Sequence, residues 1–490
     1  AGDAYELTLT KEGDDWTMTG KDGIIGVTGD KQMTIGRTGE NICTTWSIKP
    51  VSSGEMVEIT STMLGWGMIK YNSADKYFLN NASYWDPIQL YRSNAEKTIA
   101  KEVSDFSIPD HADVTIAEGG NLKISYGDRK LDSVCMNEGG KITIESDKTL
   151  TIQNMVIRST MAGGKSGQVV GINENNFSIS GDAYYEVTLG KGGTNRQYHA
   201  FSVPFSVDAV DGIYDSNGTK LTIDYNYFIM DYHGDVRAQG QYGWKKFYGT
   251  LQPGVFYMMA TDGHRTTYRM KMATTFSKAD NELAVHAYAP TGGQAIDAGW
   301  NGTGNSQLEY VSVGADVQVL NPETYTFEVK PAGSTHFIVG TPFFYQASAE
   351  GSLVLVSANV DNNYAPRRMG NKEVKDVAIT LSNDQYTDYL YLSATDEAMN
   401  EYQVGRDLVK MTMTNTPAVP QIFAEAYGNK LCMVDAPMMN DEATYALSLY
   451  APANGEYTMS AEQVEDYELF LTKNGVVMRN LTMSDATIDL

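Results

Sequence analysis

Hydrophobic and polar residues alternate with a period of two along most of this chain. The segments 56–59, 88–91 and 389–392 show the pattern clearly. Alternation places one face of a strand against a core and leaves the other face in solvent. Glycine-rich turns separate these short segments, as they do in sandwiches of antiparallel strands. The pattern therefore predicts an all-β chain, and only residues 394–411 indicate a helix.

An internal repeat lies in the first half of the chain. The segment 114–124 is answered by 134–144, and the Glu-Gly-Gly at 118–120 recurs at 138–140. One strand on each side of a Gly-Gly corner is typical of a parallel β-helix or a similar stacked solenoid. Glycine supplies the positive φ that a tight corner requires. A plain meander of hairpins is the alternative.

A second duplication follows the repeat. Residues 201–205 and 337–343 each read as an apolar strand that a proline ends. Residues 488–490 still alternate at the end of the sequence, so we expect more chain to follow in the parent protein. We predict four regions: a small N-terminal all-β module at 1–110, β-helix-like repeat coils at 111–182, a duplicated β-sandwich region at 183–345 and a C-terminal antiparallel β-sandwich at 346–490.

The net charge of the chain excludes one class of partner. It carries 37 Lys and Arg against 61 Asp and Glu, for a formal net charge of −24. Nucleic-acid binders need a basic surface, so we exclude nucleic acid as a partner. No apolar run approaches the roughly 18 residues of a membrane-spanning helix. No leader follows Ala1, so we expect that any export signal has been removed or that the chain was cut from a longer one.

Motifs for catalysis are missing from the sequence. The six histidines form no HExxH pair, although a metal site assembled in space would escape this test. Residues 163–166 resemble the end of a phosphate-binding loop, but Ser159 stands where that loop needs glycine. Cys43, Cys135 and Cys432 are too far apart for a CxxC site, and we expect buried thiols. We therefore predict a protein that is not an enzyme, with no catalytic residues, no metal and no cofactor.

Two oxygen-rich turns are candidates for structural calcium. They lie at 215–218 and 361–363. Neither has the ligand spacing of an EF-hand loop. Plain Asx turns account for both of them.

Aromatic residues give the positive signal for recognition. Trp66, Tyr71, Tyr77, Tyr84 and Trp85 are close together in the sequence. Rigid amphipathic rings give contact area at a low entropy cost. We expect Trp66 to pack in a core, whereas the adjacent Tyr84 and Trp85 cannot both point inward on a regular strand. The predicted binding residues are Tyr71, Tyr77, Tyr84 and Trp85.

Several of these segments, taken in order, resemble large cell-surface proteins of Bacteroidota that are exported by type IX secretion. The resemblance is carried by residues 87–91, by the Glu-Gly-Gly repeat, by 342–346 with Arg367 and Arg368, and by 468–471. The C-terminal sorting domain of those proteins is absent from this sequence. The resemblance implies a protein secreted to the outer surface of a Gram-negative bacterium, where it acts as an adhesin, a scaffold or a recruiting factor without catalysis.

Two classes of function stay open. In the first, the acidic chain binds a cationic extracellular protein, because opposite charge raises the rate of encounter. The habitat of the resembling proteins suggests a host protein, such as the digestive protease trypsin. In the second, the coil binds or cleaves polysaccharide, and Asp128, Asp132 and Glu145 are the acidic residues around it. An inert surface stalk is a further alternative.

Overall fold

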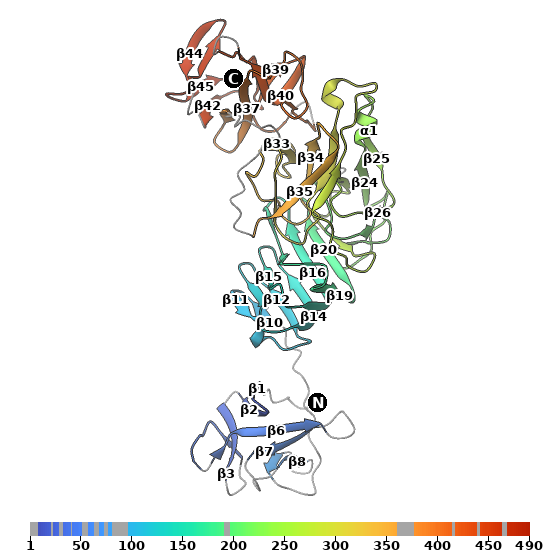
Figure 1. The fold of residues 1–490 in the computed structure, drawn as a ribbon, viewed down its shortest axis with the longest axis vertical. Coiled ribbons are helices and arrows are strands. Elements are labelled where there is room, and N and C mark those ends of the chain that lie inside the picture. The colour runs from blue at the N-terminus through green and yellow to red at the C-terminus, as the bar shows by residue number, and fades with distance from the viewer. Residues whose placement is uncertain are drawn as a thin grey trace. The chain divides into compact units, whose positions relative to one another are not determined.

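The protein is described here from a computed structural model. The described residues are 8–20, 23–28, 33–40, 42–50, 57–62, 68–72, 77–80, 97–190, 197–359, 377–413, 417–438, 442–462 and 468–490. The chain divides into two compact units, Ala1–Ala95 and Glu96–Leu490. Within the described residues nearly all regular structure is strand, and α1 (Gly234–Arg237) is the one α-helix (Figure 1). The predicted all-β class is confirmed, and no described helix is long and apolar enough to cross a membrane.

The first unit contains one antiparallel sheet. Its order in the described residues is β4-β3-β2-β6-β7-β8-β9, with β1 paired to β2 and β5 paired to β3. Trp46 is fully buried, and its indole Nε1 donates to the Ile25 carbonyl oxygen at 3.1 Å. The strands are β1 (Thr8–Glu12), β2 (Asp15–Gly20), β3 (Gly23–Thr28), β4 (Met33–Ile35), β5 (Ile42–Cys43), β6 (Thr45–Pro50), β7 (Val57–Ser61), β8 (Met68–Asn72) and β9 (Tyr77–Asn80).

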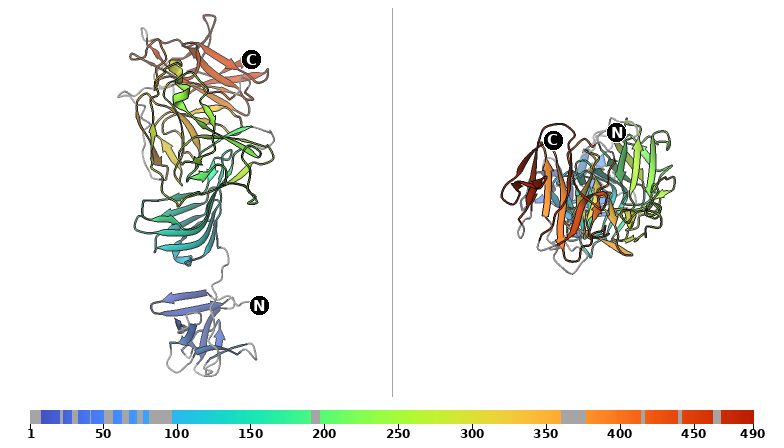
Figure 2. Two further views of the ribbon diagram at one scale, coloured as in Figure 1. Left: turned by 90° about the vertical axis from the view of Figure 1, so that its right-hand side faces the viewer. Right: turned by 90° about the horizontal axis from the view of Figure 1, so that it is seen from above.

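The second unit begins with strands that pair in parallel, which we call the parallel region (Figures 1 and 2). Successive strands alternate between two sheets, β10-β12-β14-β16-β20 and β11-β13-β15-β18. Val114 pairs with Val134 and Leu122 pairs with Ile142, so the strands stack in the register of the sequence repeat. A meander of hairpins does not describe these strands. Their bounds are β10 (Lys97–Ile99), β11 (Glu102–Ser104), β12 (Asp113–Ile116), β13 (Asn121–Ile124), β14 (Arg129–Met136), β15 (Lys141–Ile144), β16 (Leu150–Thr160), β18 (Gln168–Val170) and β20 (Ala183–Thr188).

The two glycines of each repeat serve different purposes. Gly119 has φ of +75°, as the sequence predicts for a corner, and a Cβ there would meet nothing within 4 Å. Gly120 does not have a positive φ, but a Cβ on it would lie 2.1 Å from the carbonyl oxygen of Ile99. The second glycine is therefore needed because the backbone of the preceding turn passes too close for a side chain. The sequence analysis explained both glycines by φ, which is correct only for the first.

The parallel region extends beyond the predicted limits of 111 and 182. Strands β10 and β11, which we had assigned to the N-terminal module, pair in parallel with β12 and β13. Strand β20, which we had assigned to the duplicated region, pairs in parallel with β16. These strands lack the Glu-Gly-Gly signature, so only their pairing shows where they belong.

Short antiparallel sheets follow between residues 197 and 359. Their orders are β21-β27-β24-β25, β29-β35-β31 and β30-β34-β32-β33. The first proline-containing segment agrees with the prediction, since β21 ends before Pro204. The second does not, because Pro342 begins β34 instead of ending a strand. The bounds are β21 (Tyr198–Phe201), β24 (Tyr227–Tyr232), β25 (Trp244–Lys246), β27 (Tyr257–Thr261), β29 (Glu282–Val285), β30 (Trp300–Gly304), β31 (Val311–Val313), β32 (Val317–Leu320), β33 (Phe327–Lys330), β34 (Pro342–Gln346) and β35 (Gly351–Ser357).

Smaller elements complete this part of the chain. Strands β17 (Lys165–Ser166) and β19 (Phe177–Ile179) pair with β16, and β22 (Val207–Asp208) pairs with β26 (Thr250–Leu251). Strand β28 (Thr267–Lys271) joins β20 to β23 (Ile213–Asp215). The 3-10 turns are η1 (Asp105–Ser107) and η2 (Ala295–Asp297).

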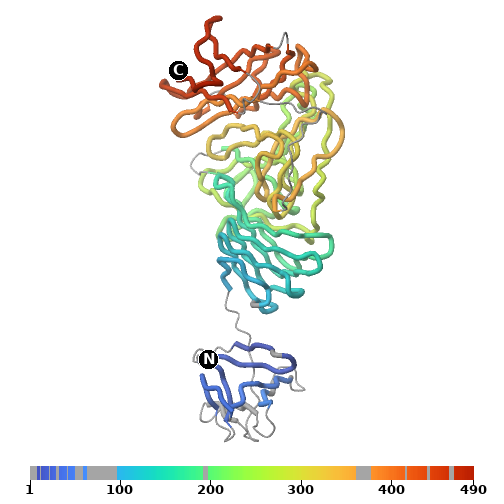
Figure 3. Tube along the Cα trace, turned by 60° about the vertical axis from the view of Figure 1, so that its left-hand side comes forward, coloured from blue at the N-terminus to red at the C-terminus, as the bar shows by residue number. Residues whose placement is uncertain are grey.

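The last part of the chain forms a mixed sheet, which we call the C-terminal sheet (Figure 3). Its order is β41-β39-β40-β37-β36-β42-β45, with β38 paired to β40 and with β37 and β40 parallel. Residues 394–411 are not helical, because β37 continues to Thr395 and β38 forms a strand near the end of the segment. The bounds are β36 (Val377–Ser382), β37 (Thr387–Thr395), β38 (Leu408–Val409), β39 (Gln421–Ala426), β40 (Asn429–Pro437), β41 (Leu447–Tyr450), β42 (Glu456–Glu462), β45 (Ala486–Asp489) and the separate hairpin β43 (Phe470–Lys473) and β44 (Val476–Asn480).

Candidate binding site

A pocket of about 400 Å³ lies between β29 and β30 in the second unit. In the described part of the chain, each of these strands is the outer strand of its own sheet, so the pocket separates two sheet edges. Residues 279–286 line one side, residues 300–306 line the other, and the turn at 253–255 completes the lining. We call this cavity the edge pocket.

Side chains tie the two sides of the edge pocket together at both ends. At one end, the Asn301 amide donates to the His286 carbonyl oxygen at 2.9 Å, and its oxygen accepts from the His286 N–H at 2.9 Å. At the other end, Ser306 Oγ and Gln307 Nε2 donate to the Asp280 carbonyl oxygen at 3.2 and 3.0 Å. Because both ends are fixed by hydrogen bonds, the pocket is preformed.

Two acidic residues belong to the β29 side of the lining. Asp280, Glu282, Ala284 and His286 are exposed and line the pocket, while Val285 is buried. Alternation accounts for Glu282 and Ala284, which share a face of β29, whereas Asp280 precedes the strand. The lining therefore carries two carboxylates, and no lysine or arginine is among its residues.

The one imidazole in the lining is held by a further carboxylate. His286 Nδ1 lies 2.9 Å from Glu350 Oε2, and the Ala287 N–H donates to Glu350 Oε1 at 3.0 Å. Glu350 thus fixes the ring and adds negative charge beside the pocket. Both side chains of this pair are more than half exposed, so the pair itself adds little stability.

Trp300 anchors the β30 side of the pocket. It is fully buried, and its Nε1 donates to the Ile296 carbonyl oxygen at 2.7 Å. The Arg237 guanidinium lies 4.8 Å from the centre of the indole ring and is paired with Asp297 at 3.3 Å. Because Asp297 balances Arg237, this nearby cation does not cancel the negative charge of the pocket.

The pKa values of two tyrosines in the lining are raised by their surroundings. Burial raises the pKa of Tyr288, and the negative charges of Asp235 and Glu350 raise it further. Burial also raises the pKa of Tyr232 to about 12, although Arg237 opposes this change. Both phenols stay protonated at neutral pH, so they offer hydroxyl groups and ring faces rather than charge.

The hydroxyl groups in the pocket are not arranged for nucleophilic catalysis. Thr303 Oγ1 donates to the Gly254 carbonyl oxygen at 2.8 Å, and Ser306 Oγ donates to the Asp280 carbonyl oxygen. An activated serine or threonine instead needs a general base as its hydrogen-bond partner. These two hydroxyls therefore serve the backbone, and the arrangement suits binding of a positively charged group.

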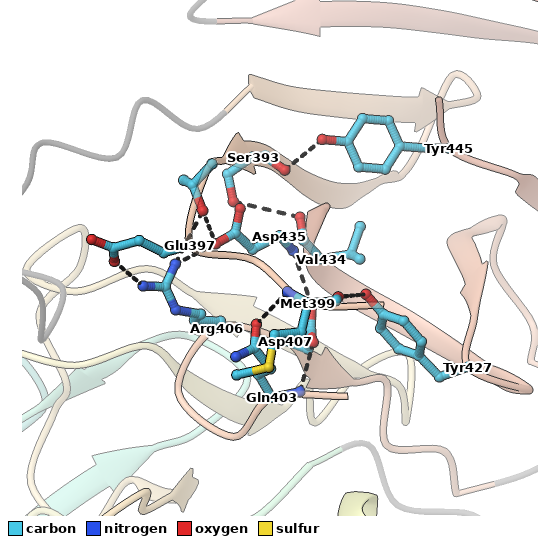
Figure 4. Close-up of polar contacts among 11 residues, drawn as sticks. Ser393, Glu397, Met399, Gln403, Arg406, Asp407, Tyr427, Val434, Asp435 and Tyr445 are labelled. Carbon is cyan, nitrogen blue, oxygen red and sulfur yellow. Dashed lines mark hydrogen bonds and ion pairs between the residues drawn. The ribbon is translucent and has the colours of Figure 1, made fainter. Parts of the chain in front are cut away.

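A second polar cluster lies in the C-terminal sheet, where residues 396–407 cross β40 (Figure 4). Arg406 Nη1 donates to Asp435 Oδ2 at 2.7 Å and to Thr395 Oγ1 at 3.1 Å, and Nη2 is paired with Glu397. Asp435 is only 2% exposed. The guanidinium therefore compensates a carboxylate that would be costly to bury alone.

Asp407 fixes the same segment through the backbone (Figure 4). Its carboxylate accepts from the Gln403 N–H at 2.8 Å and from the Asp435 N–H at 3.0 Å. Burial raises the pKa of Asp407 to about 6, while these hydrogen bonds oppose the shift. This cluster is a structural latch, since Arg406, Asp407 and Asp435 Oδ2 pair with one another and with the neighbouring backbone, while Asp435 Oδ1 is buried without a hydrogen-bond partner among the described residues.

A buried ion pair lies between β37 and the chain after β38. Lys410 and Asp388 are paired, and both are almost fully buried. Asp388 Oδ2 also accepts from the Ile422 N–H at 2.7 Å. Burial raises the pKa of Asp388, whereas Lys410 and this hydrogen bond oppose the change.

The binding residues predicted from the sequence are only partly within the described structure. Tyr71 lies in β8 and Tyr77 lies in β9, where Tyr77 pairs with Asn72 across the hairpin. The structure describes the backbone at these two positions and not the side chains. Tyr84 and Trp85, together with Trp66, lie outside the described residues. Their role as binding residues stays a prediction.

The cysteines and the two turns considered as calcium sites are located as follows. Cys43 and Cys432 are buried, Cys135 is half-buried, and each of the three is a thiol rather than part of a disulfide. The Asp215 carboxylate accepts from the Asn217 and Thr219 N–H groups, as an Asx turn does. The turn at 361–363 lies outside the described residues. The part of the chain that is described contains no group of three His, Cys, Asp or Glu residues that could hold a metal ion.

The edge pocket was not predictable from any motif in the sequence. Asp280, Glu282 and Trp300 form no motif, and the two sides meet only in the folded chain. One signal was present, since residues 279–329 contain no lysine or arginine in a chain that has 37. Comparison with known proteins found no matching family model, no matching curated protein and no matching solved structure.

Proposed function

We propose that this chain is a non-catalytic binding protein that captures a cationic extracellular protein. The observation that carries the proposal is the edge pocket, which has Asp280 and Glu282 in its lining and no lysine or arginine. The net charge of −24 supports it, because a negative surface attracts a cationic partner from a distance. A location on the bacterial surface, and a host protease such as trypsin as partner, rest on the sequence resemblance alone.

The test is capture of proteins of different charge by the immobilised full chain. Trypsin, further basic proteins and acidic proteins of similar size are applied at low salt and eluted with a salt gradient. We expect selective retention among the basic proteins and release as salt shortens the range of electrostatic attraction. Retention of every basic protein in simple proportion to its net charge, or retention of none, would contradict the proposal.

A second candidate, polysaccharide binding, is favoured by one pair of rings on the parallel region. Phe106 and Tyr126 are 67% and 70% exposed, and their ring centres are 4.9 Å apart. The buried Asp105 carboxylate accepts from the Ser125 and Tyr126 N–H groups, so the support beneath the rings is rigid. Exposed rings on a firm base are a surface on which sugars stack.

Native gels that contain plant or mucin polysaccharide test this alternative. The wild-type chain should be retarded in such gels, and the substitutions Phe106→Ala and Tyr126→Ala should abolish the retardation. This result would favour polysaccharide binding over protein capture. Release of new reducing ends would show cleavage and would contradict the prediction that the chain is not an enzyme.

A further inference from the structure

The edge pocket is specific enough to indicate what part of the partner enters it. We infer that it receives the side chain of a single lysine or arginine presented by the captured protein, an inference that rests on the function proposed above. The ligand group is thus an ammonium or guanidinium on an aliphatic stem, carried by a folded or extended polypeptide.

Charge is the first reason for this inference. Asp280 and Glu282 are two residues apart on the pocket side of the chain, and both are exposed at its lining. Glu350 adds a further carboxylate at the His286 end of the pocket, where it is bonded to the imidazole. A cation that enters meets carboxylates without a competing lysine or arginine in the lining, and hydrogen bonds to charged groups are the strong ones.

The size and chemistry of the cavity are the second reason. A volume of about 400 Å³ is near the lower end of the range for pockets that hold small ligands. It suits one long side chain better than a polysaccharide. Tyr288 contributes ring surface to the lining, and aromatic rings attract ammonium and guanidinium groups. The contact of Arg237 with Trp300 shows the same chemistry within this chain.

Preorganisation is the third reason. The hydrogen bonds of Asn301 at one end and Ser306 at the other fix the spacing of the two sides before any ligand binds. Gly254 adds to this, because a Cβ there would lie 2.8 Å from the Leu283 side chain and would push into the β29 side. A pocket that is already open loses little conformational entropy when it binds.

Short peptides test the inference directly. Four capped peptides with the same sequence are labelled, and their central residue is lysine, arginine, glutamate or norleucine. Their affinities for the full chain are measured by fluorescence anisotropy. We expect the lysine and arginine peptides to bind, the norleucine peptide to bind at least tenfold more weakly, and the glutamate peptide not to bind.

Two variants of the chain locate the binding. The double variant Asp280→Asn with Glu282→Gln should weaken the basic peptides by about tenfold. Ala284→Trp, at an exposed position of the lining, should block the pocket without removing any core contact. The matched control is Glu174→Gln with Glu456→Gln, which removes the same charge from two exposed sites outside the lining and should bind as the wild type does.

The outcomes separate this inference from the proposed function. If the wild-type chain captures basic proteins and Ala284→Trp captures them equally well, the function stands and the pocket inference is wrong. If the basic peptides bind through the two carboxylates but no basic protein is captured, the function as proposed is wrong. Equal losses in the double variant and in its matched control would show a general effect of charge and would also overturn the pocket inference.

Discussion

The parallel region and the C-terminal sheet place charged groups inside the protein in different ways. In the parallel region, the fully buried Asp105 accepts hydrogen bonds from the backbone N–H groups of the next turn, and Arg129 lies 3.1 Å from its carboxylate. In the C-terminal sheet, Asp388 of β37 is paired with Lys410, and both side chains are almost fully buried. The buried carboxylate thus depends mainly on backbone N–H groups in the first region and on a buried cation in the second.

The hydrophobic cores of the parallel region and the C-terminal sheet also differ. Ile116 and Met136 are fully buried one repeat apart, and Leu122 and Ile142 do the same in the second sheet. Each turn of the parallel region stacks on its neighbours, as in other stacked repeats, and the last turns also bond to Val339 through Ser159, Ser166 and Tyr185. The C-terminal sheet joins β37 to β36 on one side and to β40 on the other, so its charged pair belongs to the centre of one cooperative core. The two regions should therefore fail differently when they are mutated.

The largest effect is expected at the buried ion pair. Lys410→Met leaves the Asp388 carboxylate buried without its cation, and we expect a loss of about 3–5 kcal/mol in the free energy of unfolding at neutral pH. This loss is measured from the hydrogen-exchange protection of peptides that cover β37 and β40. The double variant Asp388→Asn with Lys410→Met removes both charges and keeps an acceptor for the Ile422 N–H, so it should recover part of the loss. Equal destabilisation by both variants would contradict this explanation.

A smaller effect is expected at the corner of the parallel region. Gly120→Ala places a Cβ against the Ile99 carbonyl oxygen and should cost about 3 kcal/mol, as overpacking does. The matched change Gly119→Ala meets open space and should cost only the 1–2 kcal/mol or so of a positive φ. Thermal unfolding followed by circular dichroism ranks the two. If Gly119→Ala is the more damaging variant, backbone conformation and not space limits the corner.

The smallest of the three effects concerns pH. The pKa of Asp407 in the folded protein, about 6, lies above the ordinary value of an aspartate, so the folded state holds the proton more tightly. Asp407 therefore adds stability at low pH, and this stability is lost as the pH rises from about 4 to about 6. The total is on the order of 2–3 kcal/mol.

Comparison with Asp407→Asn isolates this contribution, since other carboxylates titrate in the same range. The free energy of unfolding of the wild type, minus that of the variant, should decline between about pH 4 and pH 6 and be flat above pH 7. A difference that rises with pH would show that the carboxylate is stabilised as the anion, contrary to the effect of its burial.

Local patterns in the sequence were sufficient for part of the fold. The alternation of residues such as Tyr389 and Leu390 predicted strands, and the recurrence of Glu-Gly-Gly located the strands that stack in register. Region limits were less accurate, because β10, β11 and β20 join the parallel region through pairing that leaves no signature. The helix predicted at 394–411 is absent for another reason. Arg406 and Asp407 form hydrogen bonds with β40, and these tertiary contacts override the local preference for a helix.

The sequence by itself determined the β character, the acidity and the repeat, because each depends on composition or on residues close together in the chain. Only the tertiary structure decided which charges are buried and where a pocket forms. His286 and Asn301 become neighbours when the outer strands of two sheets meet, and no spacing along the chain records that meeting. Side-chain chemistry is local to a residue, but a binding site is a property of the surfaces that the fold brings together.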